Sequence, residues 1–232
     1  AQELKENTYN LTRMNLVMRG IRPDNIVTRN GDTLEEDWPF FDENDPVNTY
    51  NPLYVDSVVS NPPYSQAWDP SNKEHDPRYS RFGLAPKGKA DYAFLLHDLF
   101  HIKPDGIMTI VLPHGVLFRG GEEGQIRKNL IENNHIDTII GLPANIFFGT
   151  GIPTIIIVLK QKRENTDTLI IDASKGFIKE GKNNKLRASD IKRIVDAVMN
   201  RESIDKFSRL VSREEIRSND YNLNIPRYVD SS

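Results

Sequence analysis

Residues 54–64 read Tyr-Val-Asp-Ser-Val-Val-Ser-Asn-Pro-Pro-Tyr, and the fold class follows from this stretch. Its first residues are rich in β-branched and aromatic side chains, which predicts a short buried strand. Asn61, Pro62 and Pro63 then end the strand, because prolines cannot continue its hydrogen-bonded ladder. The turn has three interpretations: a purely structural turn, a polyproline ligand, or a binding site at the end of a strand. The polyproline interpretation is disfavoured because tyrosine directly follows the prolines.

The interpretation as a binding site rests on the chemistry of the turn. Asn61 offers a side-chain carbonyl oxygen, and Pro62 offers a backbone carbonyl that its fixed φ angle holds in place. Two such acceptors can converge on the two protons of one exocyclic amine and direct its lone pair toward an electrophile. Tyr64 adds a flat aromatic face on which a planar base can stack. These three positions, with Pro63, form the candidate catalytic site.

The regions on either side of this turn alternate between strand and helix patterns. Further strands are predicted at residues 25–28, 107–112, 136–140, 154–159 and 168–171. Helices are predicted at residues 3–19, 90–101, 122–134 and 189–199, the last capped by Ser189, with a short final helix capped by Ser212. This alternation predicts an α/β domain with a mostly parallel sheet and ligands at the carboxyl ends of its strands. Asp32 and Asn61 both follow predicted strands, so we expect them at that same edge.

Composition narrows the class of protein. The 232 residues contain no cysteine, which excludes disulfides, thiolate metal sites and cysteine nucleophiles. No apolar run reaches the roughly 18 residues of a spanning helix, so a cytoplasmic protein without a membrane partner is expected. The formal net charge is −3. Because DNA affinity comes mainly from lysine and arginine, a role on DNA requires a local basic surface or a partner subunit.

The turn and four further segments carry a resemblance to a known family. Asn-Pro-Pro-Tyr after a strand resembles the catalytic motif of amino methyltransferases that use S-adenosylmethionine. The further segments resemble the modification subunit of type I restriction-modification systems in the same order; they are residues 90–97, 111–121, 141–150 and 221–228. The resemblance implies a Rossmann-like methyltransferase sheet with helices on both faces. It also implies methyl transfer to N6 of an adenine that is flipped out of DNA.

The resemblance also implies which residues bind the donor S-adenosylmethionine. By analogy with the family, Glu3 accepts from the ribose hydroxyls, Asp32 accepts from the amine of the donor's adenine, and Asn61 lies beside the donor. Each hydrogen bond to a charged group contributes about 1.5 to 3 kcal/mol. Two such contacts give weak binding, so we expect the 232-residue chain alone to bind the donor poorly and not to methylate DNA.

The target base and the macromolecular partners follow from the same resemblance. Tyr64 and either Phe147 or Phe148 are expected to pack against the flipped base. The expected partners are DNA, a specificity subunit, a restriction subunit and a second copy of the modification subunit. No metal is expected, since His97 and His101 share a predicted helix face without a third ligand.

The domain organisation is expected to be incomplete at the amino terminus. In this family a glycine-rich turn precedes the position of Glu3, and nothing of that kind precedes it here, so the chain is expected to begin after the first strand and helix of the methyltransferase domain. Residues 1–172 are expected to form the catalytic domain, without its first strand. Residues 173–232 are expected to form a C-terminal helical extension and tail, beginning with an exposed loop at 174–187.

Several alternatives remain open at this point. The same motif can orient another planar amine, such as a glutamine side chain in protein or guanine in RNA, or the chain can be a non-catalytic assembly module. Residues 65–89 mix basic, acidic and aromatic side chains, which suits either DNA contact or a solvated loop. The tail at 221–228 suits either docking to a partner or packing on the chain's own core.

Overall fold

The computed structural model describes residues 39–40, 51–52, 54–146 and 151–232. The predicted helix at 3–19 and the predicted strand at 25–28 lie outside these residues. The described strands are β1 (Pro39–Phe40), β2 (Asn51–Pro52), β3 (Val55–Ser60), β4 (Ile102–Pro113), β5 (Ile136–Gly141), β6 (Thr154–Lys160), β7 (Thr168–Asp172), β8 (Ile178–Glu180), β9 (Asn183–Lys185) and β10 (Ser208–Val211). The described helices are α2 (Asp91–Phe100), α3 (Gly121–Glu132), α4 (Ala188–Asn200) and α5 (Arg213–Ser218), with 3-10 turns η2 (His114–Leu117) and η3 (Ile225–Arg227).

Six of these strands form one mixed sheet in the order β10-β7-β5-β6-β4-β3. β3 pairs in parallel with β4, and β5 pairs in parallel with β7. β6 lies between β4 and β5 and is antiparallel to both, and β10 is antiparallel to β7. β3, β4, β5 and β7 therefore point the same way, as the sequence predicts, while β6 and β10 reverse direction. β5 and β6 are joined by residues 142–153, and the described part of this link contains no crossover helix of the kind that usually joins parallel strands.

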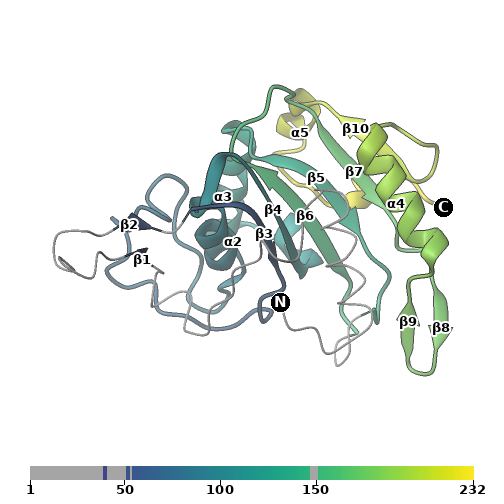
Figure 1. Cartoon of the computed structure of the whole chain (residues 1–232), viewed down its shortest axis with the longest axis horizontal. Coiled ribbons are helices and arrows are strands. Elements are labelled where there is room, and N and C mark those ends of the chain that lie inside the picture. The colour runs from purple at the N-terminus through teal and green to yellow at the C-terminus, as the bar shows by residue number, and fades with distance from the viewer. Residues whose placement is uncertain (1–38, 41–50, 53, 147–150) are drawn as a thin grey trace.

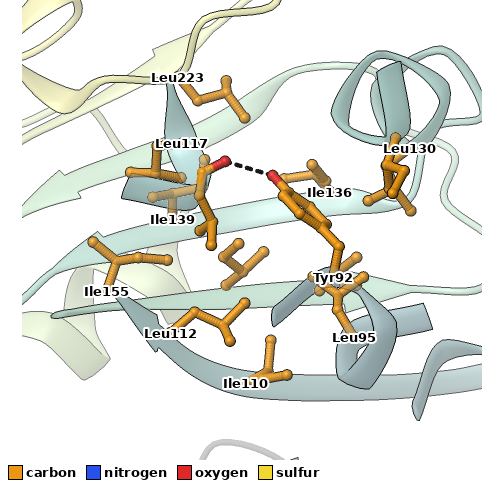
Figure 2. Close-up of a cluster of buried hydrophobic side chains, with 14 of the residues drawn as sticks. Tyr92, Leu95, Ile110, Leu112, Leu117, Leu130, Ile136, Ile139, Ile155 and Leu223 are labelled. Carbon is orange, nitrogen blue, oxygen red and sulfur yellow. Dashed lines mark hydrogen bonds between the residues drawn. The ribbon is translucent and has the colours of Figure 1, made fainter. Parts of the chain in front are cut away.

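Helices cover both faces of this sheet, as predicted (Figure 1). Alternate residues of β6 point to opposite faces: Ile155 and Ile157 belong to a first core, and Ile156 and Val158 belong to a second. The first core packs α2 and α3 on the sheet, and the second packs α4. Figure 2 shows part of the first core, where the hydroxyl of buried Tyr92 donates to a backbone carbonyl of η2.

The region after residue 172 contains more strand than the sequence predicts. The predicted loop at 174–187 contains the hairpin of β8 and β9, which lies outside the main sheet. β10 joins the main sheet beside β7. The helix predicted to start at Ser189 begins earlier, because the Asp190 carboxylate at its third position accepts from the backbone N–H of Arg187, 2.9 Å away, and makes Arg187 the cap. Ser212 does cap α5 as predicted, with its Oγ accepting from Glu215 N at 3.2 Å.

The C-terminal tail packs on the chain's own core. Leu223 and Ile225 are buried in the first core together with Tyr228, and Figure 2 shows Leu223 next to Leu117 of η2. The backbone N–H of Leu223 donates to the carbonyl of Leu117 over 2.8 Å. The core alternative for the tail is therefore correct. Among the described residues, no helix is long and apolar enough to span a membrane.

Candidate active site

Four strands end at one edge of the sheet, and the candidate site lies there. β3 leads into Asn61, β4 into His114, β5 into Leu142 and β7 into Ala173. These strands share one direction, so their carboxyl ends lie on the same side. Ligands of open α/β sheets bind at this edge. The fold therefore places the Asn-Pro-Pro-Tyr turn where a substrate is expected.

Within the turn, polar groups face outward and apolar groups anchor it. Asn61 and Pro63 are exposed, Pro62 is buried, and Tyr64 is half-buried against the second core. The Tyr64 hydroxyl donates to Asn61 Oδ1 at 3.0 Å. A carbonyl oxygen has two lone pairs, so this bond orients the Asn61 amide and leaves it one further acceptor position. Burial raises the pKa of Tyr64 above its ordinary value, and the nearby Asp91 charge adds to this, so Tyr64 stays a neutral hydrogen-bond donor.

A buried carboxylate fixes the backbone directly after the turn. Asp91, fully buried at the first position of α2, accepts from the backbone N–H of Ser65 at 2.8 Å. Ser65 has a φ of 49°, which is an unfavourable region for a residue with a side chain. Such a conformation persists only where surrounding contacts hold it, and the bond to Asp91 is one of them. The α2 amino terminus further favours a negative charge at this position.

An arginine links this carboxylate to the next helix. Arg119 donates from one terminal nitrogen to Asp91 Oδ2 at 3.0 Å, and it binds both oxygens of Glu123 at 2.7 and 3.0 Å. Asp91 and Glu123 are buried, so the guanidinium supplies the positive charge that two desolvated carboxylates need. Gly115 makes room for it, because a Cβ there would lie 2.3 Å from the Arg119 side chain. We call Asp91, Arg119 and Glu123 the anchoring network.

A second carboxyl group, on α2, contacts the residue that directly precedes the turn. Burial raises the pKa of Asp98, on α2, to about 7, although a hydrogen bond from the Ser60 side chain opposes the shift. Ser60 is the last residue of β3 and directly precedes Asn61. Asp98 Oδ2 is buried without a hydrogen-bond partner among the described residues. The residue directly before the turn therefore contacts a carboxyl group whose pKa lies well above its ordinary value.

Comparison with known proteins decides the family. The sequence model of the family described as N-6 DNA Methylase matches residues 1–232. The chain belongs to the N-6 DNA methylase family. Asn61 to Tyr64 thus lie in a methylase-family fold, at the edge of the sheet where the alternation of strands and helices predicts them.

Relatives of this methylase-family chain are named as subunits of type I restriction enzymes. It is 41% identical over 236 residues to the "Type I restriction enzyme MpnII methylase subunit" of Mycoplasma pneumoniae, covering 99% of this chain and 43% of that protein. It is 33% identical over 242 residues to the MjaVII methylase subunit of Methanocaldococcus jannaschii, covering 98% and 40%. A solved type I methyltransferase subunit from Streptococcus thermophilus superposes with a TM-score of 0.82 at 55% identity, covering 99% of this chain and 48% of that one. The chain therefore spans less than half the length of each of these relatives.

The structure brings together only part of the predicted site. Asn61, Pro62, Pro63 and Tyr64 form one outward-facing turn. The other predicted site residues lie outside the described residues; they are Glu3, Asp32, Phe147 and Phe148. Their roles at the donor and the target base stay predictions.

The segment between the turn and α2 uses its aromatic residues internally. Trp68, Tyr79 and Phe82 are all buried in the first core. The segment is closed by the backbone bond from Ala90 N to Gln66 O at 2.8 Å. These rings are therefore not free to stack on nucleic-acid bases. Any DNA contact by residues 65–89 would have to use their polar and basic side chains.

The histidine pair of α2 is engaged in other contacts. His97 Nδ1 lies 3.0 Å from a terminal nitrogen of Arg78, and its ring packs against that of His101 at a centroid distance of 4.5 Å. Across residues 54–146 and 151–232, no group of three metal-ligating side chains comes together.

The sequence left the role of Asp91 open and gave none to Arg119 or Glu123. An aspartate at the start of a helix can either cap the helix or bind a neighbouring group, and Asp91 does the second, with Ala90 as the cap residue. Arg119 stands 28 positions from Asp91, so no local pattern joins them. The one available signal was an arginine and a glutamate four residues apart near a helix start.

Proposed function

We propose that this chain is the catalytic part of a type I restriction-modification methyltransferase that methylates N6 of adenine at specific DNA sites. The observation that carries the proposal is the exposed Asn61 amide, oriented by Tyr64 at the carboxyl edge of the sheet in a methylase-family fold. The names of the relatives support this reaction and this substrate.

The turn would prepare a weak nucleophile. The lone pair of the adenine amine is delocalised into the ring, so the amine attacks poorly unless its protons are held out of the ring plane. Asn61 Oδ1 would accept one proton through its remaining lone pair, and the Pro62 carbonyl would accept the other. Holding the amine in one orientation lowers the activation free energy, because the ordering of the amine is already achieved when the base binds.

Tyr64 would stack on the flipped adenine rather than accept a proton. Its raised pKa keeps the phenol protonated at neutral pH, so it has no basic oxygen to offer. Its ring can stack on an adenine that has left the duplex, and such stacking contributes about 1 to 3 kcal/mol per base. That contribution offsets part of the cost of flipping the base out. The amine proton then leaves to solvent after transfer.

The donor we propose is S-adenosylmethionine. When bound, it supplies an electrophilic methyl group on a positively charged sulfur. The described part of the site fits such a donor, because the exposed amide of Asn61 lies at the edge where cofactors of α/β sheets bind. Glu3 and Asp32 would complete the donor site by binding the ribose and the adenine.

The proposed partners follow from the type I relatives. A specificity subunit would recognise the DNA site, a second modification subunit would join it, and a restriction subunit would add cleavage, in the cytoplasm. The net charge of −3 supports a need for a partner that supplies phosphate contacts.

Product analysis tests the proposal. The assembled enzyme containing this chain would be incubated with isotope-labelled S-adenosylmethionine and DNA, RNA or protein, and the products would be digested for mass spectrometry. The proposal expects the label in N6-methyladenine of DNA. Label in methylated guanine or glutamine would show that the amine was assigned to the wrong substrate. An absence of label in every product, from enzyme that is folded and binds donor, would show an assembly module.

A further inference from the structure

The hairpin of β8 and β9 lies at the same edge of the sheet as the proposed catalytic turn. It follows β7, whose carboxyl end shares the direction of β3. Figure 1 shows it projecting away from the sheet beside α4. β3 and β7 are separated by four strand spacings, which at about 4.8 Å each is about 19 Å.

The hairpin segment is strongly basic in an acidic chain. Residues 174–187 contain five lysines or arginines and one acidic residue, whereas the whole chain carries a net charge of −3. Three of the five cations have partners within the chain: Lys175 donates to the Ser231 carbonyl, Arg187 pairs with Asp190, and Lys185 makes a contact of its own.

The remaining two, Lys179 and Lys182, are exposed. Neither forms an ion pair with another residue in the described part of the chain. Lys179 lies in β8, and Lys182 lies in the two-residue turn. Both are therefore free to meet an anion from outside.

The hairpin is held firmly in place. Asn184, buried in β9, donates from its side chain to the Ala144 carbonyl at 2.6 Å and from its backbone to the Asn145 carbonyl at 2.9 Å. Gly181 opens the turn with a φ of 62°, a conformation that glycine adopts without penalty at the first central position of a tight hairpin turn. These contacts tie the hairpin to the loop after β5, which belongs to the same edge.

We propose that the β8–β9 hairpin binds the sugar-phosphate backbone of DNA beside the target base, with Lys179 and Lys182 neutralising phosphates. The proposal rests on the proposed function. DNA advances about 3.4 Å per base pair, so the spacing of about 19 Å between β3 and β7 is long enough for the hairpin to contact phosphates that flank the target base rather than the base itself. A two-stranded ribbon is also narrow enough to enter the major groove.

DNA fits this surface better than a protein partner. Protein interfaces are depleted of lysine and enriched in aromatic and apolar side chains. The hairpin shows one large exposed apolar side chain, Ile178 at 44% exposure, among its lysines and asparagines. Phosphate contacts need no apolar surface, and they suit flexible lysine side chains.

The experiment compares two double variants of the assembled enzyme, each lacking the same charge. Lys179→Gln/Lys182→Gln alters the hairpin. Lys103→Gln/Lys162→Gln alters exposed lysines at the opposite edge of the sheet, where Lys103 forms a solvent-exposed pair with Asp56. Binding to a duplex with the target site is measured over a series of salt concentrations, together with kcat for methylation at saturating DNA. The hairpin variant should lower the slope of log K against log salt by about 1.8, because each phosphate contact contributes about 0.9. That slope change corresponds to about 30-fold weaker binding at 0.15 M salt, with kcat unchanged.

The control variant should keep the slope of the unsubstituted enzyme. An unchanged slope in the hairpin variant overturns the inference. If subunit assembly is weakened as well, the hairpin binds a protein partner instead of DNA. A similar loss in both variants would reduce the effect to net charge and also overturn it. A reduced slope in an enzyme that never methylates adenine would support the hairpin and reject the proposed function, so the two failures are distinguishable.

Discussion

Two segments of this chain have similar sequences but differ in burial. Asn61-Pro62-Pro63-Tyr64 faces outward at the edge of the sheet, whereas Asn224-Ile225-Pro226-Arg227-Tyr228 packs into the first core. Both segments place a tyrosine hydroxyl on a nearby oxygen: Tyr64 on the Asn61 side chain, and Tyr228 on the Asn222 backbone carbonyl.

The two segments differ in burial because different side chains stand next to their asparagines. In the tail, Leu223 and Ile225 alternate with asparagines and insert into the core, so the segment is held by apolar burial. The turn at residues 61–64 buries Pro62 and part of Tyr64, and the backbone directly after it is held by the anchoring network. Polar anchoring leaves the Asn61 amide exposed, which suits a site rather than a core.

Arg119→Met tests polar anchoring and carries the largest expected effect. It leaves Asp91 and Glu123 buried without a counter-ion, so the free energy of unfolding should fall by about 3 to 5 kcal/mol. Denaturant titration measures this. The matched control is Arg217→Met, which removes the exposed pair with Glu132 and should cost about 1 kcal/mol or less. Equal losses in the two variants would refute the claim that buried charge holds the turn.

Leu223→Ala tests apolar anchoring of the tail. Removing a fully buried leucine should lower the free energy of unfolding by about 3 kcal/mol, since the cavity it leaves is only partly refilled. The exposed Pro226 provides the control, and Pro226→Ala should change stability by less than about 1 kcal/mol. A Leu223→Ala chain of normal stability that fails to assemble with partners would reverse the assignment of the tail to the core.

The buried Asp98 carboxyl group makes the region directly before the turn sensitive to pH. Its folded pKa of about 7 exceeds the ordinary value, so its contribution to stability is fully present below about pH 4 and is lost as pH rises through 7. Between pH 5 and pH 7 the free energy of unfolding should fall by about 2 kcal/mol on this account. Denaturant titrations at several pH values should show that fall, and Asp98→Asn should remove it.

Ser60→Ala provides the second arm of the pH experiment. The Ser60 hydrogen bond lowers the folded pKa of Asp98, so its loss should extend the fall in stability to higher pH while the fall begins at the same pH. A pH profile that neither substitution alters would exclude Asp98 as the titrating group.

Much of the fold was predictable because local patterns of apolar residues indicate its strands and helices. The apolar runs at 136–140 and 154–159 predict β5 and β6 within one residue, since buried strands need continuous β-branched side chains. The hairpin of β8 and β9 escaped prediction because β8 is exposed along its whole length and its sequence carries no apolar alternation. β10 is only four residues long, and its pairing with β7 is set by packing rather than by its own sequence.

The residues of the candidate site also fall into a group that local sequence indicates and a group that it does not. Asn61 to Tyr64 could be proposed as a site from the sequence because the motif is contiguous and its chemistry is specific. The anchoring network was not, since Asp91 and Arg119 meet only when α2 and the start of α3 pack against each other. The sequence could show which groups suit the chemistry, while the groups that hold them depend on tertiary contacts.

The central claim is that Asn61 does chemistry while the similar tail asparagine does not. Asn61→Ala and Asn224→Ala would each be made in the assembled enzyme, and both the DNA methylation rate and the unfolding midpoint would be measured. We expect Asn61→Ala to lose about a hundredfold in rate, which corresponds to about 3 kcal/mol for one positioned hydrogen-bonding group, with its midpoint unchanged. Asn224→Ala should stay within about twofold of the normal rate. Near-normal methylation by folded Asn61→Ala enzyme would contradict the account.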